Sequence, residues 1–255
     1  SGGMLFSKGQ GAVRKILMRN TQQTIAYPQS KREEVADLLH GVTVADPYRW
    51  LEDLNTEATQ GWINGQNEVT ATYLAHIPQR TAIRQRLTEL WNYERYGIPF
   101  RRGDRYFFTR NDGLQNQAVL YWTPTLTAEP QPLLDPNQLS PDGTVALSGY
   151  AVSEDGRLLA YGLSASGSDW TEWRVRDVES GRDHDDRLQW IKFSGAAWTH
   201  DHAGFFYSRF DAPSADVTFK DVNHYQKLYY HRLGTPQTDD QLIYERPDQK
   251  EWGFG

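Results

Sequence analysis

The stretch SEDGRLLAY, residues 153–161, decides the fold because it returns in altered form as THDHAGFFY at residues 199–207. Each copy begins with Ser or Thr, continues through a turn that contains an acid and a glycine, and ends in an apolar and aromatic strand pattern. The second copy starts 46 residues after the first, and RRGDRYFF at residues 101–108 is a looser, earlier copy. A repeat of roughly 40 to 50 residues that holds several strands is typical of a β-propeller blade.

Short strand patterns fill the chain from about residue 93 onward. They are bounded by Gly, Asp, Asn or Pro, and no helix-length periodic segment interrupts them. This order favours antiparallel sheets over a parallel βαβ layout. Closed propellers have about 4 to 8 blades, whereas residues 93–255 supply about three. We therefore expect an incomplete propeller, with a blade face left exposed where EWGFG, residues 251–255, ends the sequence.

Two amphipathic helices are predicted ahead of the strands. Asn55 or Thr56 is a candidate cap for the first, whose apolar residues recur at three- and four-residue spacings until Pro78. The second is expected over residues 80–91, with its apolar residues on one face. Neither helix can bury its apolar stripe against the other alone, so both need a further surface to pack on. Residues 27–92 are expected to form this helical segment.

Composition limits the function classes. The 255 residues carry 27 basic and 33 acidic side chains, and the net charge of −6 gives no reason to expect nucleic-acid or membrane partners. Cysteine is absent, which excludes disulfides and thiolate chemistry and fits a cytoplasmic protein. Residues 1–26 are expected to be a disordered leader or tag, in preference to an amphipathic targeting peptide.

The serine-rich loop YGLSASGSDW, residues 161–170, is a candidate nucleophile loop. A serine elbow needs the pattern G-x-S-x-G and a following helix, but Ser166 stands where the second glycine belongs, and a strand pattern follows. We interpret Ser164, Ser166 and Ser168 as turn formers, with Asp169 as a further cap of the turn. No G-x-S-x-G occurs anywhere in the chain, so no catalytic residue is predicted.

Histidine and carboxylate clusters raise the question of a metal site. His184 lies in GRDHDDR, and His200 and His202 lie in WTHDHAG. Both stretches are interpreted as solvated turns, and the acids around His184 as a solvated hairpin. Neither a P-loop nor a G-x-G-x-x-G run is present, so the sequence predicts no metal and no cofactor.

Five longer strings carry a resemblance to a known family. They are DPYRWLED (46–53), GLQNQAVLYW (113–122), LLDPNQLSPDGTVALSGYAVSEDGRLLAYGLSASGSDW (133–170), IKFSGAAWTHDHAGFFYSRF (191–210) and HYQKLYYHRLGT (224–235). In this order along the chain, they resemble the N-terminal part of prolyl oligopeptidase, a serine peptidase of the S9 family. The resemblance covers about residues 27–255.

The resemblance implies a fold and an activity. Those enzymes insert a seven-bladed propeller into an α/β-hydrolase domain, restrict access to short peptides, and cleave after proline. Residues 27–92 would then be the helical start of a hydrolase domain that is otherwise absent, and residues 93–255 about three blades of the propeller. The family's catalytic Ser, Asp and His follow the propeller, so the resemblance places none of them in this chain.

The resemblance also transfers substrate contacts. The phenylalanine of KFS, which in relatives lines the pocket for a residue upstream of the proline, matches Phe193. Without the resemblance, Phe193 reads as an inward-facing strand aromatic. Trp252 and Gly253 lie at a second lining position, where relatives often carry a larger apolar residue in place of Gly253.

Two functions follow as hypotheses. In the first, the chain is the N-terminal fragment of a prolyl oligopeptidase, inactive alone, whose partners are short proline-containing peptides and the missing hydrolase domain. In the second, it is a stand-alone or docking propeller module that binds without catalysis.

Overall fold

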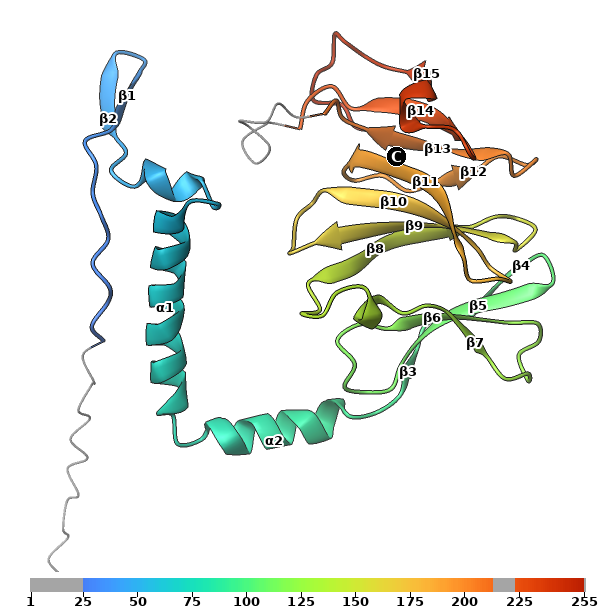
Figure 1. Cartoon of the computed structure of the whole chain (residues 1–255), viewed down its shortest axis with the longest axis horizontal. Helices are drawn as coiled ribbons and strands as arrows, with labels where there is room; N and C mark the ends of the chain where they lie inside the picture. The colour runs from blue at the N-terminus through green and yellow to red at the C-terminus, as the bar shows by residue number, and fades with distance from the viewer. Residues whose placement is uncertain (1–24, 213–222, 255) are drawn as a thin grey trace, which may run out of the picture. The chain divides into compact units, whose positions relative to one another are not determined.

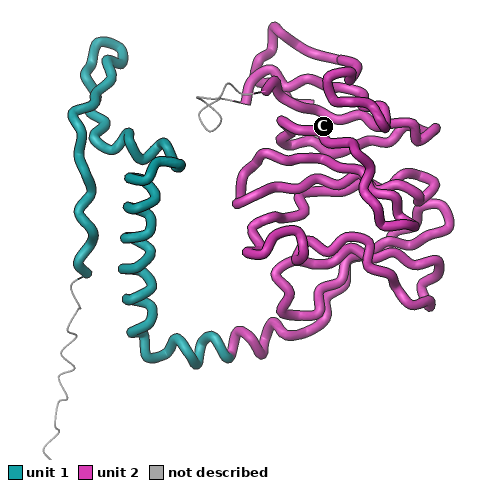
Figure 2. Tube along the Cα trace, in the orientation of Figure 1, with its two compact units in different colours: residues 1–85 teal, residues 86–255 magenta. Residues whose placement is uncertain are grey.

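The computed structural model describes residues 25–212 and 223–254. The chain divides into two compact units, residues 1–85 and 86–255 (Figure 2). The predicted leader therefore lies outside the described residues, except for its last two. Within the described ranges, no helix is long and apolar enough to cross a membrane.

Unit 1 begins with a small hairpin and continues into helices. Its elements are β1 (Ala36–Leu39), β2 (Val42–Ala45), the 3-10 helix η1 (Arg49–Glu52), α1 (Glu57–Ala75) and α2 (Arg80–Trp91), the last of which runs across the boundary into unit 2. The hairpin turn uses left-handed backbone at Gly41, whose φ is 82°. This conformation suits glycine because it has no Cβ to clash with the backbone.

Helix α1 forms where the capping pattern predicts it. Of the two candidate caps, Thr56 is the one used: its hydroxyl oxygen accepts a hydrogen bond from the Thr59 N–H at 3.2 Å. The Thr59 hydroxyl in turn donates to the Trp50 carbonyl oxygen at 3.0 Å, which ties the start of the helix to η1. The predicted bounds of the second helix are confirmed, because α2 spans Arg80–Trp91.

The described residues of unit 2 form three antiparallel sheets, which follow one another in Figure 1 from β3 to β15. The first sheet contains β3 (Arg95–Tyr96), β4 (Phe100–Arg102), β5 (Arg105–Asn111), β6 (Val119–Thr123) and β7 (Gln131–Leu134). The second, after the 3-10 helix η2 (Pro136–Gln138), contains β8 (Val145–Val152), β9 (Leu158–Ala165), β10 (Thr171–Asp177) and β11 (Asp183–Ile191). The third contains β12 (Ala197–Trp198), β13 (Gly204–Arg209), β14 (Lys227–Arg232) and β15 (Gln241–Tyr244), with the 3-10 helix η3 (Gln237–Asp239) between the last two.

These sheets confirm the prediction of a mainly β, partial propeller of about three blades. In the second and third sheets every strand pairs with its sequence neighbours, as in a meander, whereas in the first sheet both β3 and β4 pair with β5; each sheet is open. The repeat that suggested blades lies at matching hairpin turns, β8–β9 and β12–β13. In both, the first residue's hydroxyl donates to the Asp carboxylate two residues on at 2.6 Å, Ser153 to Asp155 and Thr199 to Asp201. His202 takes the place of the turn glycine Gly156, and both have positive φ.

Two apolar cores lie between neighbouring sheets. Phe107, Leu120 and Leu134 of the first sheet pack with Leu159 and Tyr161 of the second. The other core joins the second and third sheets through Val175, Leu188, Ile191, Phe205 and Tyr207. Full burial of a large apolar side chain contributes about 1.5–3 kcal/mol. Each sheet is therefore stabilised chiefly by the sheets beside it.

The prediction of a solvated hairpin around His184 is confirmed except at Asp186: β10 and β11 pair antiparallel on either side of residues 178–182, and residues 179–185 are exposed. Strand β11 begins at Asp183, so His184 and the acids after it belong to a strand and not to a turn. Alternation along that strand turns Asp186 inward, where its side chain is only 1% exposed. The sequence did not predict the burial of Asp186, because carboxylates are seldom buried.

Candidate functional site

Phe193 lies just beyond the end of β11, in a loop that leads to β12. Its φ is 55°, in the left-handed region, and its side chain is 68% exposed. The interpretation of Phe193 as an inward-facing strand aromatic is therefore wrong. Left-handed backbone costs a non-glycine residue about 1–2 kcal/mol, and such strain often marks a functional position.

Contacts on both sides of Phe193 hold this loop in place. On its C-terminal side, the Ser194 hydroxyl oxygen accepts a hydrogen bond from the Ser208 N–H at 2.8 Å. On its N-terminal side, the Phe210 N–H donates to the Trp190 carbonyl oxygen at 2.9 Å. The end of β13 and the residue after it thus fix the backbone that presents the exposed phenyl ring.

Trp252 lies beyond β15 and is also partly exposed, at 49%. The Arg246 guanidinium carbon lies 4.6 Å from the centre of one of its rings, and Arg246 forms an ion pair with Asp248 at 2.7 Å. The backbone N–H of Trp252 donates to the Gln249 carbonyl oxygen at 3.0 Å. The indole is therefore held in a turn, with one face covered by a cation.

The segments that carry Phe193 and Trp252 meet at a buried amide. The Gln226 Nε2 donates to the Lys192 carbonyl oxygen at 2.9 Å, and Gln226 Oε1 accepts from the Phe254 N–H at 2.5 Å. The structure thus links the segments of the two candidate substrate contacts, although β12, β13, β14 and β15 separate them in the sequence.

A cavity of about 210 Å³ lies beside this amide. Its walls are Asp211, Tyr225, Gln226, Lys227, Glu245, Arg246 and Pro247. Lys227 forms an ion pair with Asp211 at 2.7 Å, and the hydrogen bond to this carboxylate raises the pKa of Lys227. The walls of the cavity thus carry both positive and negative side chains.

A buried charge network joins the second and third sheets. His231 on β14 is fully buried; its Nδ1 lies 2.7 Å from Asp240 Oδ1 and its Nε2 lies 2.9 Å from Asp186 Oδ1. Burial opposes protonation, but the hydrogen bonds to Asp186 and Asp240 outweigh it and raise the pKa of His231 to about 9. The Tyr207 hydroxyl donates to Asp240 Oδ2 at 2.5 Å, and burial raises the pKa of Tyr207.

Sequence reasoning missed this network. The available signal was the alternation along KLYYHRL, which places His231 on the same buried face as Tyr229. An imidazolium held between two carboxylates has no open side for a substrate, so we assign it a structural role.

The serine loop and the exposed histidines do not form a catalytic group. Residues 166–170 connect β9 to β10, and the Ser168 hydroxyl accepts from the Trp170 N–H at 3.1 Å, as expected of a turn former. His200 is solvated at 94% side-chain exposure, whereas His202 is 22% exposed and lies 3.3 Å from Asp155. The prediction of a solvated side chain therefore holds for His200 and is wrong for His202.

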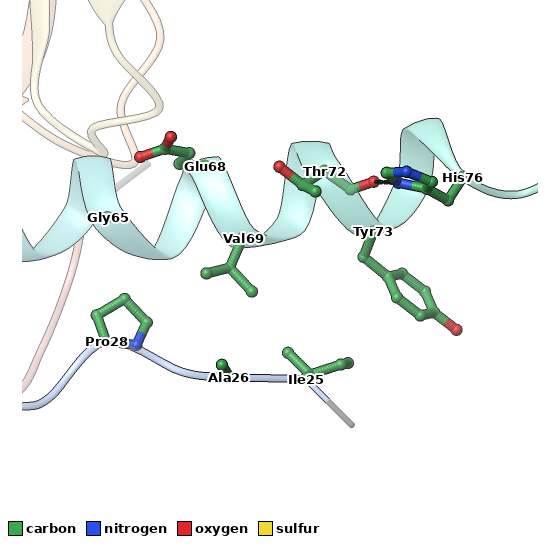
Figure 3. A pocket seen from close by; sticks show the side chains of 9 residues that line it. All are labelled: Ile25, Ala26, Pro28, Gly65, Glu68, Val69, Thr72, Tyr73 and His76. Carbon is green, nitrogen blue, oxygen red and sulfur yellow. Dashed lines mark hydrogen bonds between the residues drawn. The ribbon is translucent and has the colours of Figure 1, made fainter. Parts of the chain in front are cut away.

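A separate groove of about 350 Å³ lies in unit 1. Ile25, Ala26 and Pro28 run alongside α1 and face Val69 and Tyr73 (Figure 3). The His76 ring nitrogen Nδ1 lies 2.7 Å from the Thr72 carbonyl oxygen, which holds the imidazole against the helix. The side chains of Val69 and Tyr73 point toward residues 25–28, so the facing sides of the groove are mainly apolar.

Known proteins are similar to this chain in sequence and fold. Residues 27–255 match the family described as "Prolyl oligopeptidase, N-terminal beta-propeller domain". Prolyl endopeptidase of Elizabethkingia meningoseptica is 39% identical over 219 residues, which cover 86% of this chain and 31% of that protein. Prolyl oligopeptidase A of Amanita bisporigera is 35% identical over 273 residues, covering 94% of this chain and 35% of that protein.

Solved structures agree. A prolyl endopeptidase structure superposes with a TM-score of 0.77 at 36% identity, over 87% of this chain and 33% of that one. Prolyl oligopeptidase B of Galerina marginata, bound to a 35mer hydrolysis and macrocyclization substrate, gives 0.71 at 28% identity, over 89% and 34%. The chain spans about a third of the length of these relatives. It belongs to the family of prolyl oligopeptidase N-terminal β-propeller domains.

Proposed function

We propose that this chain forms the front part of a proline-specific serine peptidase. Residues 27–92 contribute the helical start of the hydrolase domain, and residues 93–255 contribute the first blades of a propeller that admits only short peptides. The observation that carries the proposal is the match along residues 27–255, which runs through the helices and all three sheets. The cytoplasm is proposed as the place of action, and the lack of cysteine fits this location.

Within this function, Phe193 and Trp252 contact the substrate residue upstream of the proline. Their exposure, the left-handed backbone of Phe193 and the linkage of both segments through Gln226 support this role. Phe193 lies in a loop outside the sheet, and at 68% exposure its side chain is open to a ligand. A surface of this kind suits the apolar side of a peptide.

The 255 residues are proposed to be inactive alone and to need the hydrolase domain as a partner. They contain no serine elbow. Helix α2 also leaves a row of apolar side chains half exposed, namely Ile83, Leu87, Leu90 and Trp91. Such a row needs a protein surface to cover it. The rest of a hydrolase domain would provide this surface.

A reporter peptide with a Gly-Pro bond tests the peptidase proposal. We expect no turnover by the pure chain, because it supplies neither nucleophile nor base. Turnover that a serine-directed phosphonate abolishes would overturn the claim of inactivity. A contaminating host peptidase is excluded as the source of any turnover by repeating the assay on a sample purified in parallel from cells that carry the empty vector.

The second candidate function is a propeller module that docks with another chain. The exposed apolar residues of β15, Leu242, Ile243 and Tyr244, favour it, because they lie on the last strand of the third sheet. Sedimentation and thermal melting distinguish the alternatives. A monodisperse, cooperatively melting monomer counts against a need for a docking partner.

A further inference from the structure

The amide of Gln226 connects two segments that each present an exposed aromatic ring. Gln226 itself is only 3% exposed, whereas Phe193 and Trp252 are 68% and 49% exposed. Its donor group binds the carbonyl of Lys192, directly before Phe193, and its acceptor binds the N–H of Phe254, two residues after Trp252. One side chain therefore bonds to the backbone on either side of the candidate peptide contact.

Because Gln226 is buried, the loss of either of its two hydrogen bonds would be energetically costly. A buried polar group that loses its partner keeps its desolvation penalty, so a change at Gln226 would also leave the Lys192 carbonyl or the Phe254 N–H without this partner. The Lys192 bond lies next to the left-handed residue Phe193, where the strained backbone relaxes unless the surroundings hold it.

Gly253 fits the same arrangement. A Cβ added at this position would lie 3.1 Å from Gln226 Oε1, closer than ordinary van der Waals contact. The lack of a Cβ at Gly253 thus gives the backbone room to approach the amide. The Phe254 N–H donates to the same oxygen.

We infer that Gln226 is a positioning residue for substrate binding: its amide sets the spacing between Phe193 and Trp252, and through them the affinity for a peptide residue upstream of proline. This rests on the proposed function, because the two rings must contact substrate for their spacing to matter. Gln226 is buried and acts through the two backbone segments.

Fluorine NMR of the full chain, with its nine tryptophans replaced by 5-fluorotryptophan, tests the inference. The Trp252 signal is assigned by its loss in Trp252→Phe. The probe is the peptide acetyl-Phe-Gly-Pro-amide, titrated against wild type, Gln226→Met and Gln189→Met. Gln189 provides a matched control because it is an exposed glutamine on β11, near the same loop.

We expect Gln226→Met to shift or broaden the Trp252 signal and to raise the dissociation constant about tenfold, as the loss of a buried hydrogen bond implies. Gln189→Met should match wild type in both readouts. Equal peptide affinity in wild type and Gln226→Met overturns the inference and leaves the proposed function standing. If wild type itself does not respond to the peptide, the proposed substrate contacts of Phe193 and Trp252 fail, and the inference that rests on them fails with them.

Gln226→Glu guards against a simple folding defect. At neutral pH its carboxylate still accepts from the Phe254 N–H but cannot donate to the Lys192 carbonyl. Protonation of the carboxyl restores a donor, so peptide affinity should recover as the pH falls through the pKa of the new side chain, while wild type shows no such gain. Weak affinity that persists through that protonation contradicts a positioning role.

Discussion

At the scale of single residues, the His231 network is the feature with the clearest energetic consequence. Its imidazole and both carboxylates are at most 1% exposed, so each charge depends on its partners. Removal of one partner from a buried ion pair commonly costs about 3–5 kcal/mol. A hydrophobic replacement of the whole network would be a different experiment, because it would also remove the desolvation penalty.

Asp186→Asn keeps the shape of the side chain but removes its charge. We expect it to lower the free energy of unfolding by about 2–4 kcal/mol in urea denaturation, since His231 then keeps only the Asp240 carboxylate. Asp185→Asn, at an exposed position of the same strand, is the matched control. It should change stability by no more than about 0.5 kcal/mol. Equal effects of the two variants would contradict the network's role.

The same network predicts how stability depends on pH. The pKa of His231 is raised from 6.5 to about 9 in the folded chain. The folded state therefore holds its proton more tightly, and this stabilisation is complete below pH 6.5 and is lost as the pH rises to about 9. Its size is on the order of 3 kcal/mol. The neighbouring charged or titratable groups are Asp186, His184, Asp240 and Tyr207.

Urea denaturation of wild type and His231→Gln across this pH range checks the prediction. Wild type should be the more stable protein near neutral pH, and the difference should shrink towards about pH 10 as His231 loses its proton. A constant difference would mean that His231 acts by packing and hydrogen bonding alone.

At the scale of elements, contacts between hairpin turns connect the first and second sheets. The Gly103 N–H of the β4–β5 turn donates to the Glu154 carbonyl oxygen at 2.8 Å. A Cβ at Gly103 would lie 2.2 Å from the Asp155 carbonyl oxygen, and one at Gly156 would lie 2.5 Å from the Arg102 carbonyl oxygen. Both glycines also have positive φ. The two turns can approach this closely only because neither glycine has a side chain.

A comparison of Gly103→Ala with Gly181→Ala separates the cost of losing this close contact from the cost of backbone strain. Gly181 has a similar φ of 67°, but a Cβ there meets nothing within 4 Å. We expect Gly181→Ala to cost about 1–2 kcal/mol through its left-handed backbone, and Gly103→Ala to cost at least about 2 kcal/mol more through the clash with the next sheet. Thermal and urea denaturation measure both. Equal losses would show that the close approach contributes nothing.

Local sequence patterns predicted elements well and side-chain partners poorly. The capping threonine and apolar spacing located α1 and α2, and the repeat located the matching turns. Asp186 and His231 lie 45 residues apart, and no local pattern pairs them. The position of Phe193 was also mispredicted, because alternation applies only within a strand and β11 ends at Ile191, before Phe193.

At the scale of the whole molecule, the family match covers two compact units that differ in how much of their apolar surface they bury. It runs through both compact units, although unit 1 leaves large apolar side chains of β1 and β2 exposed, Leu38, Leu39, Val42 and Val44. The three sheets of unit 2, in contrast, bury their faces against one another. We expect unit 2 to carry most of the chain's protection against amide hydrogen exchange and unit 1 to open first.

Photo-crosslinking gives the most direct test of the proposed function. A short peptide with p-benzoylphenylalanine two positions before its proline is irradiated with the intact chain, and the modified residues are identified by mass spectrometry. We predict that crosslinks fall on residues 190–194 and 249–254 and that excess unlabelled peptide suppresses them. Crosslinks confined to other segments, such as the groove along α1, or insensitive to unlabelled peptide, would contradict a peptide-contacting role for Phe193 and Trp252.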